Sequence, residues 1–373
     1  MRIAMLTDSY HPTKDGVVTS VSITKKALES EGHEVFIVAP DPGKEFRLPG
    51  VIYIGSLKFR SYAGYFIPIM PSKALRKLES LKIDIIHVHG IAVMAVRGLV
   101  YGRLLKVPVV LTFHTMVGDV LKYYLPVSIK QETAKKWIWK YIRAVLKRTD
   151  CVIAPSPGIK NELLGLSRPK RIEVIPTGTD VSRFRPGIDG SEFRRKYGLS
   201  GKVVASVGRL SYEKNIDLVV RSVRDIDATL LIVGDGPCMK DLRILTEELG
   251  MTDKVVFTGY IDNSEISAAY AASDVLVSAS GFETQGLSVL EAMACGIPVV
   301  CLDARAFHDI IQDGVNGFLF KGEDDCGDAI IRGLNASDEV RRNSLKTATD
   351  NSEEKVSEML TGLYEELIRE KRK

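Results

Sequence analysis

The sequence has little of what marks a secreted or metal-built protein. Its five cysteines are scattered, with no CxxC pair and no histidine cluster beside them. This pattern argues against a disulfide framework and a zinc site, and it is typical of a reducing compartment. No apolar run approaches the roughly 18–20 residues of a membrane-spanning helix. Asp8 interrupts the apolar N-terminal stretch too early for a signal peptide. We therefore expect a cytoplasmic protein.

The sequence also lacks the glycine fingerprint of dinucleotide-binding enzymes. The stretch 233–237 (Val-Gly-Asp-Gly-Pro) is not a GxGxxG, and its proline disfavours a dinucleotide-binding turn. Asp225 and Asp227 have the DxD spacing of metal-dependent transferases, but they precede an expected strand instead of ending one. We interpret them as part of a turn, and we expect neither a metal nor another cofactor.

What is present is the composition of an ordinary globular protein, with 45% hydrophobic and 26% charged residues. At 373 residues the chain is long enough for two domains. Its charge is unevenly distributed. Residues 1–178 carry 27 Lys and Arg against 14 Asp and Glu, whereas the remaining residues carry 24 against 33. The basic first half is therefore expected to face an anionic partner.

Both halves alternate short strand-like runs with longer amphipathic segments, which indicates parallel sheets covered on both faces. In the first half we expect strands at 3–7, 35–39, 51–54, 85–89, 109–112, 151–154 and 172–175, and helices at 21–30, 73–81, 93–105 and 129–147. In the second half we expect strands at 203–207, 229–233, 255–258, 275–278, 298–302 and 318–320, and helices at 216–223, 239–249, 264–272 and 287–294.

The stretch 176–187 separates the two halves, because its two prolines and two glycines do not fit inside regular elements. We expect one domain over residues 1–178 and a second over 179–351, with a C-terminal helix at 352–373 packed back on the first. The expected fold class is α/β, with two doubly wound Rossmann-like domains whose parallel sheets face a central cleft. A ligand binds in such a cleft, at the carboxyl ends of the strands.

Two cations lie on the loop that follows the expected strand 203–207. Arg209 and Lys214 both precede a helix that starts near Asn215. Free amides at a helix N-terminus and two side-chain cations suit an anionic ligand. A solvated basic loop is the alternative.

Two carboxylates follow the expected strand 275–278. Glu283 lies in a loop of small residues, and Glu291 lies inside an otherwise apolar helix. A carboxylate among apolar neighbours must be paired or hydrogen-bonded, and the two hydroxyls of a ribose are suitable partners. The amides of Gln285, Gly286 and Leu287 open the helix and suit a phosphate or sugar oxygen.

Two residues of the first half follow expected strands in the same way. Gly16, beyond the first strand, allows a diphosphate to approach the backbone at a helix start. His114, at the end of a buried strand, is expected to face the cleft. A histidine in the core or on the surface is the alternative for His114. His87 and His89, which lie in the expected strand 85–89, are expected to pack around that strand and are given no role.

Together these motifs resemble the retaining glycosyltransferases of family 4, which have the GT-B fold. The resemblance covers nearly the whole chain. Its most specific part is Glu283, seven intervening residues and Glu291, followed by a Gly-Ile-Pro-Val-Val strand; the Val-Gly-Arg loop agrees with it. Thr177 and Thr179 depart from the usual Asn-Gly-Val-Asp wording of the hinge, but they lie outside the catalytic set.

The resemblance implies a hexosyltransferase whose substrate is a nucleotide-sugar donor. It implies that Arg209 and Lys214 neutralise the donor diphosphate and that Glu291 binds the ribose. Glu283 and the amides after it would hold the transferred sugar. His114 would contact this sugar from the first domain, Gly16 would close over the diphosphate, and the region around Tyr260 would border the base. UDP-glucose is the first expectation for the donor, and GDP-mannose is the second.

Residues 15–20, 113–116 and Tyr123-Tyr124 resemble the enzymes of this family that glycosylate diacylglycerol-type membrane lipids. Two basic stretches support a lipid acceptor independently. Residues 57–77 carry five cations and no acid, and residues 129–148 carry seven cations, one acid and two tryptophans. Such stretches suit an anionic membrane surface, so we expect peripheral binding at the inner face of the cell membrane. Core or interdomain packing of Trp137 and Trp139 is the alternative.

Several other functions are weighed against this one. A nucleotide-sugar epimerase also binds a nucleoside diphosphate between two such domains, and a family 4 enzyme can use a soluble or polysaccharide acceptor. A nucleic-acid-binding protein would explain the basic half but not Glu283 and Glu291, so we expect no nucleic-acid partner. A non-catalytic sensor is disfavoured because all four expected donor-binding charges are present.

Overall fold

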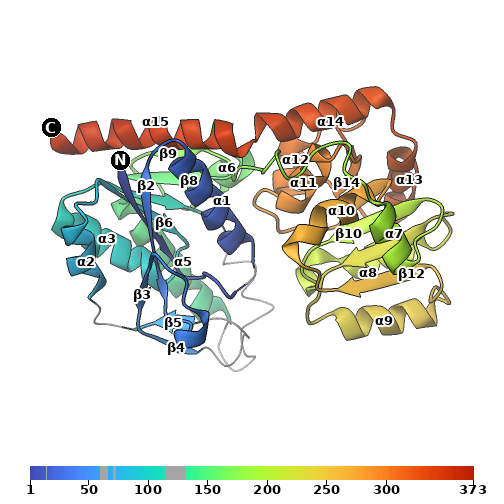
Figure 1. The fold of residues 1–373 in the computed structure, drawn as a ribbon, viewed down its shortest axis with the longest axis horizontal. Coiled ribbons are helices and arrows are strands. Elements are labelled where there is room, and N and C mark those ends of the chain that lie inside the picture. Colours follow the sequence, from blue (N-terminus) through green and yellow to red (C-terminus); the bar gives the residue numbers. More distant parts are fainter. Residues whose placement is uncertain (14, 59–65, 70–72, 115–130) are drawn as a thin grey trace. The chain divides into compact units, whose positions relative to one another are not determined.

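The computed structural model describes residues 1–13, 15–58, 66–69, 73–114 and 131–373. The chain folds as two compact units (Figure 1). The N-terminal unit comprises residues 1–178 together with 353–373, and the C-terminal unit comprises residues 179–352. Both units are α/β, and each is built on its own parallel sheet.

The N-terminal unit contains a seven-stranded parallel sheet in the order β3-β2-β1-β6-β7-β8-β9. Its strands are β1 (Arg2–Thr7), β2 (Glu34–Pro40), β3 (Val51–Ile54), β6 (Ile85–His89), β7 (Val109–Thr112), β8 (Cys151–Ala154) and β9 (Ile172–Val174). Successive side chains of a strand point to opposite faces of the sheet. Ile3 and Met5 of β1 therefore join one hydrophobic cluster, and Ala4 and Leu6 join another.

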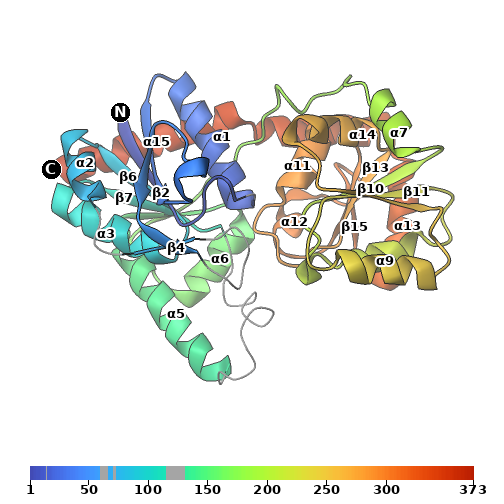
Figure 2. The ribbon, with the colours of Figure 1, turned by 60° about the horizontal axis from the view of Figure 1, so that its bottom comes forward.

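Helices cover both faces of this sheet (Figures 1 and 2). On the face of Ile3 lie α1 (Gly16–Ser30) and the C-terminal helix α15 (Glu353–Arg372), which packs along α1. On the face of Ala4 lie α2 (Ala74–Ser80), α3 (Val93–Leu105), α5 (Gln131–Arg148) and α6 (Pro157–Leu166). The short elements η1 (Lys44–Phe46), β4 (Ser56–Lys58) and β5 (Phe66–Pro68) complete the described part of the unit.

The C-terminal unit contains a six-stranded parallel sheet in the order β12-β11-β10-β13-β14-β15. Its strands are β10 (Val203–Val207), β11 (Thr229–Val233), β12 (Val255–Gly259), β13 (Val275–Ser278), β14 (Val299–Leu302) and β15 (Phe318–Phe320). Its helices are α7 (Ser191–Tyr197), η2 (Tyr212–Lys214), α8 (Ile216–Val223), α9 (Met239–Glu248), η3 (Asn263–Glu265), α10 (Ile266–Ala271), α11 (Leu287–Ala294), α12 (Arg305–Ile310), α13 (Glu323–Leu334) and α14 (Asp338–Asp350).

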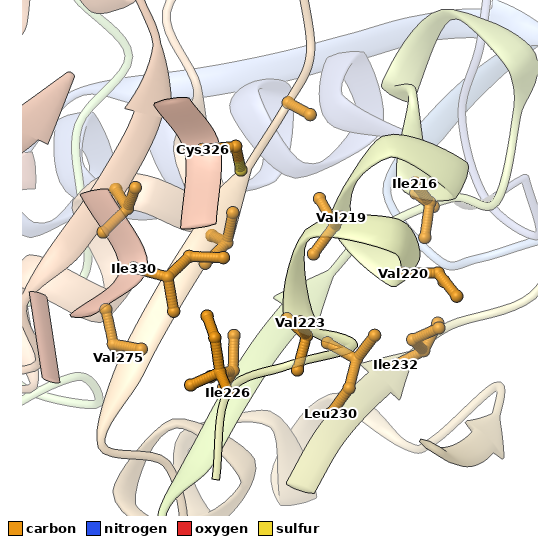
Figure 3. Packing of buried hydrophobic residues seen from close by; sticks show 14 of the residues in the cluster. Ile216, Val219, Val220, Val223, Ile226, Leu230, Ile232, Val275, Cys326 and Ile330 are labelled. Atoms are coloured by element: carbon orange, nitrogen blue, oxygen red, sulfur yellow. The ribbon is translucent and has the colours of Figure 1, made fainter. Parts of the chain in front are cut away.

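The core beneath α8 shows why this sequence folds as it does (Figure 3). Ile216, Val219, Val220 and Val223 occupy positions i, i+3, i+4 and i+7, so they share one face of the helix. They pack against strand residues such as Leu230 and are almost completely buried. Burying one such aliphatic side chain stabilises the fold by about 1.5–3 kcal/mol.

The strand order creates a switch point in each sheet. In the N-terminal unit the chain runs from β1 outward to β3 and then returns to place β6 on the other side of β1. In the C-terminal unit β13 lies beside β10 in the same way. Ligands of open α/β sheets bind at the carboxyl ends of the strands beside such a point. A ligand is therefore expected to bind at the loops after β1 and β6 in one unit and after β10 and β13 in the other.

The structure confirms the expected parallel sheets, including the strands at 51–54, 85–89, 203–207 and 275–278. It adds the β4–β5 hairpin and five helices that were not expected: α6, α7, α12, α13 and α14. Among the described residues, no helix combines the length and the apolarity needed to cross a membrane. All five cysteines are buried free thiols.

Candidate active site

Arg209 lies on the loop that follows β10, and backbone hydrogen bonds fix this loop on both sides of it. The Gly208 amide donates to the carbonyl of Val233 (2.9 Å). The Leu210 amide donates to the carbonyl of Asp235 (3.0 Å), and the Leu210 carbonyl accepts from the amide of Cys238 (2.9 Å). The backbone of Arg209 is therefore held while its side chain is exposed.

Gly234 and Gly236 allow this close contact between the loops after β10 and β11. A Cβ at Gly234 would overlap the carbonyl oxygen of Gly208, and one at Gly236 would overlap that of Leu210. Gly234 also has φ +129°, in a region that side chains rarely adopt. From the sequence, these glycines could only be excluded from a dinucleotide motif. Their role here is to support the loop that carries Arg209.

Asn215 connects the loops that follow the neighbouring strands β10 and β13. It has a left-handed backbone conformation (φ +48°) between η2 and α8. Its side-chain amide donates to the carbonyl of Ala279, just beyond β13 (3.0 Å). This hydrogen bond joins the two sides of the switch point. In the sequence, Asn215 marked only the start of a helix.

Two of the expected donor-binding residues meet across the switch point. Lys214 ends η2, Glu283 lies in the loop after β13, and their side chains form an ion pair. Both side chains are partly buried. A charge in a partly buried position interacts more strongly with a ligand than one in open solvent. Glu283 therefore holds the Lys214 ammonium at a defined place next to the helix that follows.

Gly286 shapes the N-terminus of that helix, α11. Gly286 has φ +83°, and a Cβ there would overlap the ring of Phe307 on α12. Leu287 is the first residue of α11, and Gln285 is buried. The first amides of a helix have no partner within the helix, and the helix dipole makes this end attractive to anions.

Glu291 lies one helical turn further along α11 and is largely buried. The hydroxyl of Tyr270, on α10, donates to its Oε2 atom (2.8 Å). Burial raises the pKa of Glu291 to about 7, although the hydrogen bond from Tyr270 acts in the opposite direction. The sequence required a partner for this carboxylate, and Tyr270 is the partner that it did not identify. Tyr260, the expected neighbour of the base, follows β12 and is half exposed.

Gly16 and His114 belong to the N-terminal unit. Gly16 is exposed and begins α1, and within the described part of the chain a Cβ there would meet no atom within 4 Å. The fold itself therefore does not require a glycine at this position. The side chain of Asp15 caps the helix by accepting from the amide of Val18 (2.8 Å), and it also accepts from the Ser9 hydroxyl (2.8 Å).

His114 follows β7 and lies against a second histidine. Its Nε2 atom is 3.0 Å from Nδ1 of His89, the last residue of β6. Burial lowers the pKa of His114 to about 4, so its ring is neutral near pH 7. His87, two residues before His89, is also buried. From the sequence, neither His87 nor His89 was expected to have a role.

Asp8 organises the neighbouring loop after β6. Its carboxylate accepts from the amides of Ala92 (3.1 Å) and Met94 (2.9 Å), at the start of α3. Burial raises the pKa of Asp8 to about 6 despite these hydrogen bonds. Gly90 has φ +128°, and a Cβ there would lie 2.9 Å from the Asp8 carboxylate. Asp8 therefore supports the same sheet edge that presents His114.

Comparison with known proteins identifies the family of this chain. The family model of "Glycosyltransferase Family 4" matches residues 14–183, and that of "Glycosyl transferases group 1" matches residues 190–351. The chain is 33% identical to the alpha-monoglucosyldiacylglycerol synthase of Streptococcus pneumoniae, over 92% of this chain and 81% of the relative. The chain belongs to glycosyltransferase family 4. The resemblance inferred from its motifs is thus confirmed, and this family 4 protein is a hexosyltransferase enzyme.

Other relatives show how broad the family is. This family 4 glycosyltransferase is also 30% identical to a GDP-mannose-dependent alpha-mannosyltransferase of Mycobacterium tuberculosis, over 86% of this chain and 83% of the relative. Among solved structures it resembles Anabaena HepE in complex with UDP and glucose, with a TM-score of 0.78 and 19% identity over 98% of this chain and 100% of that one. The structural similarity confirms the expected GT-B fold.

Proposed function

We propose that this glycosyltransferase moves a hexosyl group, with retention, from a nucleoside-diphosphate sugar to a diacylglycerol-type membrane lipid. UDP-glucose is the first proposal for the donor, and GDP-mannose is the second. The observation that carries the proposal is the ion pair of Lys214 and Glu283 at the β10–β13 switch point, in the loops that lead into α8 and α11. The S. pneumoniae relative, named for a glucosyldiacylglycerol product, supports the acceptor class.

The cations of the C-terminal unit suit the leaving group of this reaction. The bond between the anomeric carbon and the β-phosphate oxygen breaks, and its electron pair leaves with the phosphate. An acceptor hydroxyl oxygen forms the new bond to the anomeric carbon and releases its proton. Arg209, Lys214 and the amides that open α11 would stabilise the negative charge that grows on the diphosphate. The proposal therefore needs no metal ion.

Three further groups would hold the rest of the donor. Ribose hydroxyls would donate to Glu291, which requires its ionised form. Glu283 and the backbone at Gln285–Leu287 would hold the transferred sugar. Tyr260 would border the base. These roles follow from the family motif, and the geometry is compatible with them because each group lies at the carboxyl edge of the sheet or on α11.

His114 and Gly16 would complete the site from the N-terminal unit. Nε2 of His114 contacts His89, and the neutral ring can hydrogen-bond a sugar hydroxyl through its other nitrogen, Nδ1. Gly16 leaves room for a diphosphate beside the first amides of α1. Because a Cβ at this position would meet no atom of the described residues within 4 Å, a ligand would give a reason for glycine here.

The lipid acceptor is supported by a surface formed by α3 and α5, which we call the α3–α5 surface. Its exposed or half-exposed apolar side chains are Val96, Val100, Leu104, Trp137 and Tyr141. Trp137 is 65% exposed, so the described structure does not bury it as a core residue. An apolar groove of about 500 Å³ runs between the two helices. Figure 2 shows the N-terminal end of α5 reaching away from the sheet.

Cations border these apolar side chains. Residues 93–106 and 136–148 contain no acid, and their exposed cations are Arg103, Lys106, Lys136, Lys140, Arg143, Lys147 and Arg148. Each basic side chain near an anionic membrane surface contributes about 1 kcal/mol of attraction. We propose that this surface docks the enzyme on the inner face of the cell membrane. The predicted stretch 57–77 lies partly outside the described residues.

One experiment tests the donor and the acceptor together. The enzyme is mixed with labelled UDP-glucose or GDP-mannose and a total lipid extract, and the product is separated into lipid and aqueous phases. Label in a lipid from one donor supports the proposal and identifies that donor. If label is found only in a water-soluble product, the acceptor is a soluble molecule or a polysaccharide and the lipid assignment is wrong.

A further inference from the structure

Three histidines are packed at the carboxyl edge of the N-terminal sheet. His87 and His89 lie two residues apart on β6, and His114 follows the neighbouring strand β7. Nδ1 of His89 lies 3.0 Å from Nε2 of His114, and the two ring planes are nearly parallel (18°), with their centroids 5.3 Å apart. His89 is only 1% exposed. The His89–His114 contact is therefore a partly buried side-chain hydrogen bond whose His89 side is buried.

The remaining nitrogen of His89 decides which histidine donates. Nε2 of His89 is buried and has no hydrogen-bond partner among the described residues. If His114 donated, His89 would carry its proton on Nε2, and a buried N–H would have no acceptor. If His89 donates, only a lone pair stays unpaired. Orphaned buried N–H groups are rare in proteins because each loses a full hydrogen bond to water.

If either histidine were doubly protonated, it would donate whatever the tautomer of the other. Burial disfavours this charged form. Burial lowers the pKa of His89 well below its ordinary value and that of His114 to about 4. 

We propose that His89 is a positioning residue for sugar transfer: its Nδ1–H donates to Nε2 of His114 and keeps the His114 proton on Nδ1. The inference rests on the proposed function, in which His114 contacts the transferred sugar. Nδ1 of His114 then offers an N–H donor to a sugar oxygen, and the ring orientation is fixed from behind. The hydrogen bond at one ring nitrogen sets the tautomer at the other, as in any buried histidine pair.

The rest of the cluster holds His89 in place. The rings of His87 and His89 lie with their centroids 4.0 Å apart. Nε2 of His87 lies 2.7 Å from the Thr112 hydroxyl, and its Nδ1 lies 2.6 Å from the hydroxyl of Tyr364 on α15. Both ring nitrogens of His87 thus have hydrogen-bond partners, so this ring is held in a fixed position beside His89.

Few charged groups act on His114. Asp15, at the start of α1, raises its pKa slightly, and burial outweighs this effect. His87 and His89 face it from β6, and Tyr364 on α15 faces His87. Within the described structure, these groups set the pH range over which the tautomer is fixed.

The tautomer can be read directly from the intact enzyme. The chain has six histidines, so selective ¹⁵N-histidine labelling gives a small set of ring signals, which His89→Asn and His114→Ala assign. We expect the His114 signal at pH 7 to show a protonated Nδ1 and an unprotonated Nε2. A proton on Nε2 of His114 would overturn the proposal.

Kinetics test the consequence for the reaction. His89→Leu removes the donor, whereas the amide nitrogen of His89→Asn can replace Nδ1–H. With the donor and lipid identified above, His89→Leu should lower kcat at least tenfold and leave the donor KM within about twofold. His89→Asn should keep kcat within about threefold of wild type. A folded His89→Leu enzyme with normal kcat, or equal losses in both variants, would overturn the proposal.

Tyr364→Phe provides the matched control, because it disturbs the same buried cluster without touching the His89–His114 bond. It should retain kcat. If it loses as much activity as His89→Leu, packing explains the loss and the positioning role is wrong. His114→Ala separates the two levels of inference: normal turnover in that variant would disprove the proposed sugar contact, and the ¹⁵N signals of the wild type would still report whether His89 sets the tautomer.

Discussion

The hydroxyl of Tyr270 donates a 2.8 Å hydrogen bond to Oε2 of Glu291 and thereby joins α10 to α11. Tyr270 is buried and Glu291 is largely buried, and burial raises the pKa of Glu291 to about 7 and that of Tyr270 well above its ordinary value. Near neutral pH the free enzyme therefore holds a carboxyl that is divided between its protonated and ionised forms. Two predictions depend on this proton.

Donor binding should weaken as the pH falls below about 7. Ribose hydroxyls that donate to Glu291 favour its ionised form, so binding releases the proton that the free enzyme holds. The Kd of UDP-glucose should rise toward tenfold for each pH unit well below 7. Isothermal titration calorimetry in buffers of different ionisation enthalpy measures the released proton directly.

Glu291→Gln is the control for this proton release. The variant should bind the donor more weakly, and its Kd should no longer depend on pH in this range. A wild-type Kd that stays constant between pH 5.5 and 8 would show that Glu291 does not meet the ribose.

The same substitution should change stability in a pH-dependent way. The folded enzyme binds the Glu291 proton more tightly than the unfolded chain, because the pKa rises from 4.5 to about 7. The contribution of Glu291 to the free energy of unfolding is therefore greatest below about pH 4.5 and is lost as the pH rises to 7. The free energy of unfolding of Glu291→Gln, relative to that of the wild type, should rise by about 2–3 kcal/mol from pH 4.5 to pH 8. Urea unfolding of both proteins at the two pH values measures this difference in the free energy of unfolding. The same difference at pH 4.5 and at pH 8 would contradict the prediction.

Lys214→Ala should lose most of the activity without unfolding the enzyme. Removing one preorganised cation from a developing phosphate charge costs about 100–1000-fold in kcat. Lys346→Ala is the matched control, since Lys346 forms an exposed ion pair with Asp350 in the same unit. Exposed pairs contribute about 0–1 kcal/mol, so this variant should behave as wild type. Equal activities of the two variants would mean that Lys214 is not at the donor diphosphate.

Gly286→Ala should destabilise the C-terminal unit and impair donor binding. The new Cβ would overlap the Phe307 ring at a backbone conformation of φ +83°. Overpacking and backbone strain of this kind cost about 1–3 kcal/mol each. Gly281→Ala, in the same loop, is the control, because the nearest atom that its Cβ would meet among the described residues belongs to Leu302, at an ordinary 3.7 Å. Thermal unfolding and UDP-glucose binding should separate the two variants.

Charge reversal on α5 should release the enzyme from membranes. Lys136→Glu combined with Lys140→Glu removes two attractions and adds two repulsions at the α3–α5 surface, so co-sedimentation with anionic vesicles at low salt should fall at least tenfold. Lys321→Glu combined with Lys346→Glu changes the net charge equally on the C-terminal unit and should have little effect. If the wild type does not co-sediment, or both double variants bind equally, the α3–α5 surface is not the docking site.

The sheets could be predicted because parallel strands are buried on both faces and therefore read as short apolar runs. The helices α13 and α14 gave a weaker signal, since each begins with acidic residues and buries only a narrow apolar stripe. The β4–β5 hairpin has three residues in each strand, too few to show alternation. Length and burial thus separate the elements that were expected from those that were not.

The site residues could be proposed from motifs, but most of their partners could not. Tyr270, Asn215 and His89 act on residues 21 to 64 positions away along the chain. These contacts depend on which strands are neighbours, for example that β10 lies beside β13. Periodicity reports how a segment is buried and not which segment lies next to it, so the partners require the fold.

The return of α15 to the N-terminal unit makes the C-terminal unit an insertion within the N-terminal one. Residues 179–352 form one continuous segment that can be expressed without interruption. The N-terminal unit is assembled from two separate segments, and the second one supplies Tyr364 and the apolar face of α15. A truncation before residue 353 would therefore strip the cover from one face of the N-terminal sheet, although it removes only the last 21 residues of the chain.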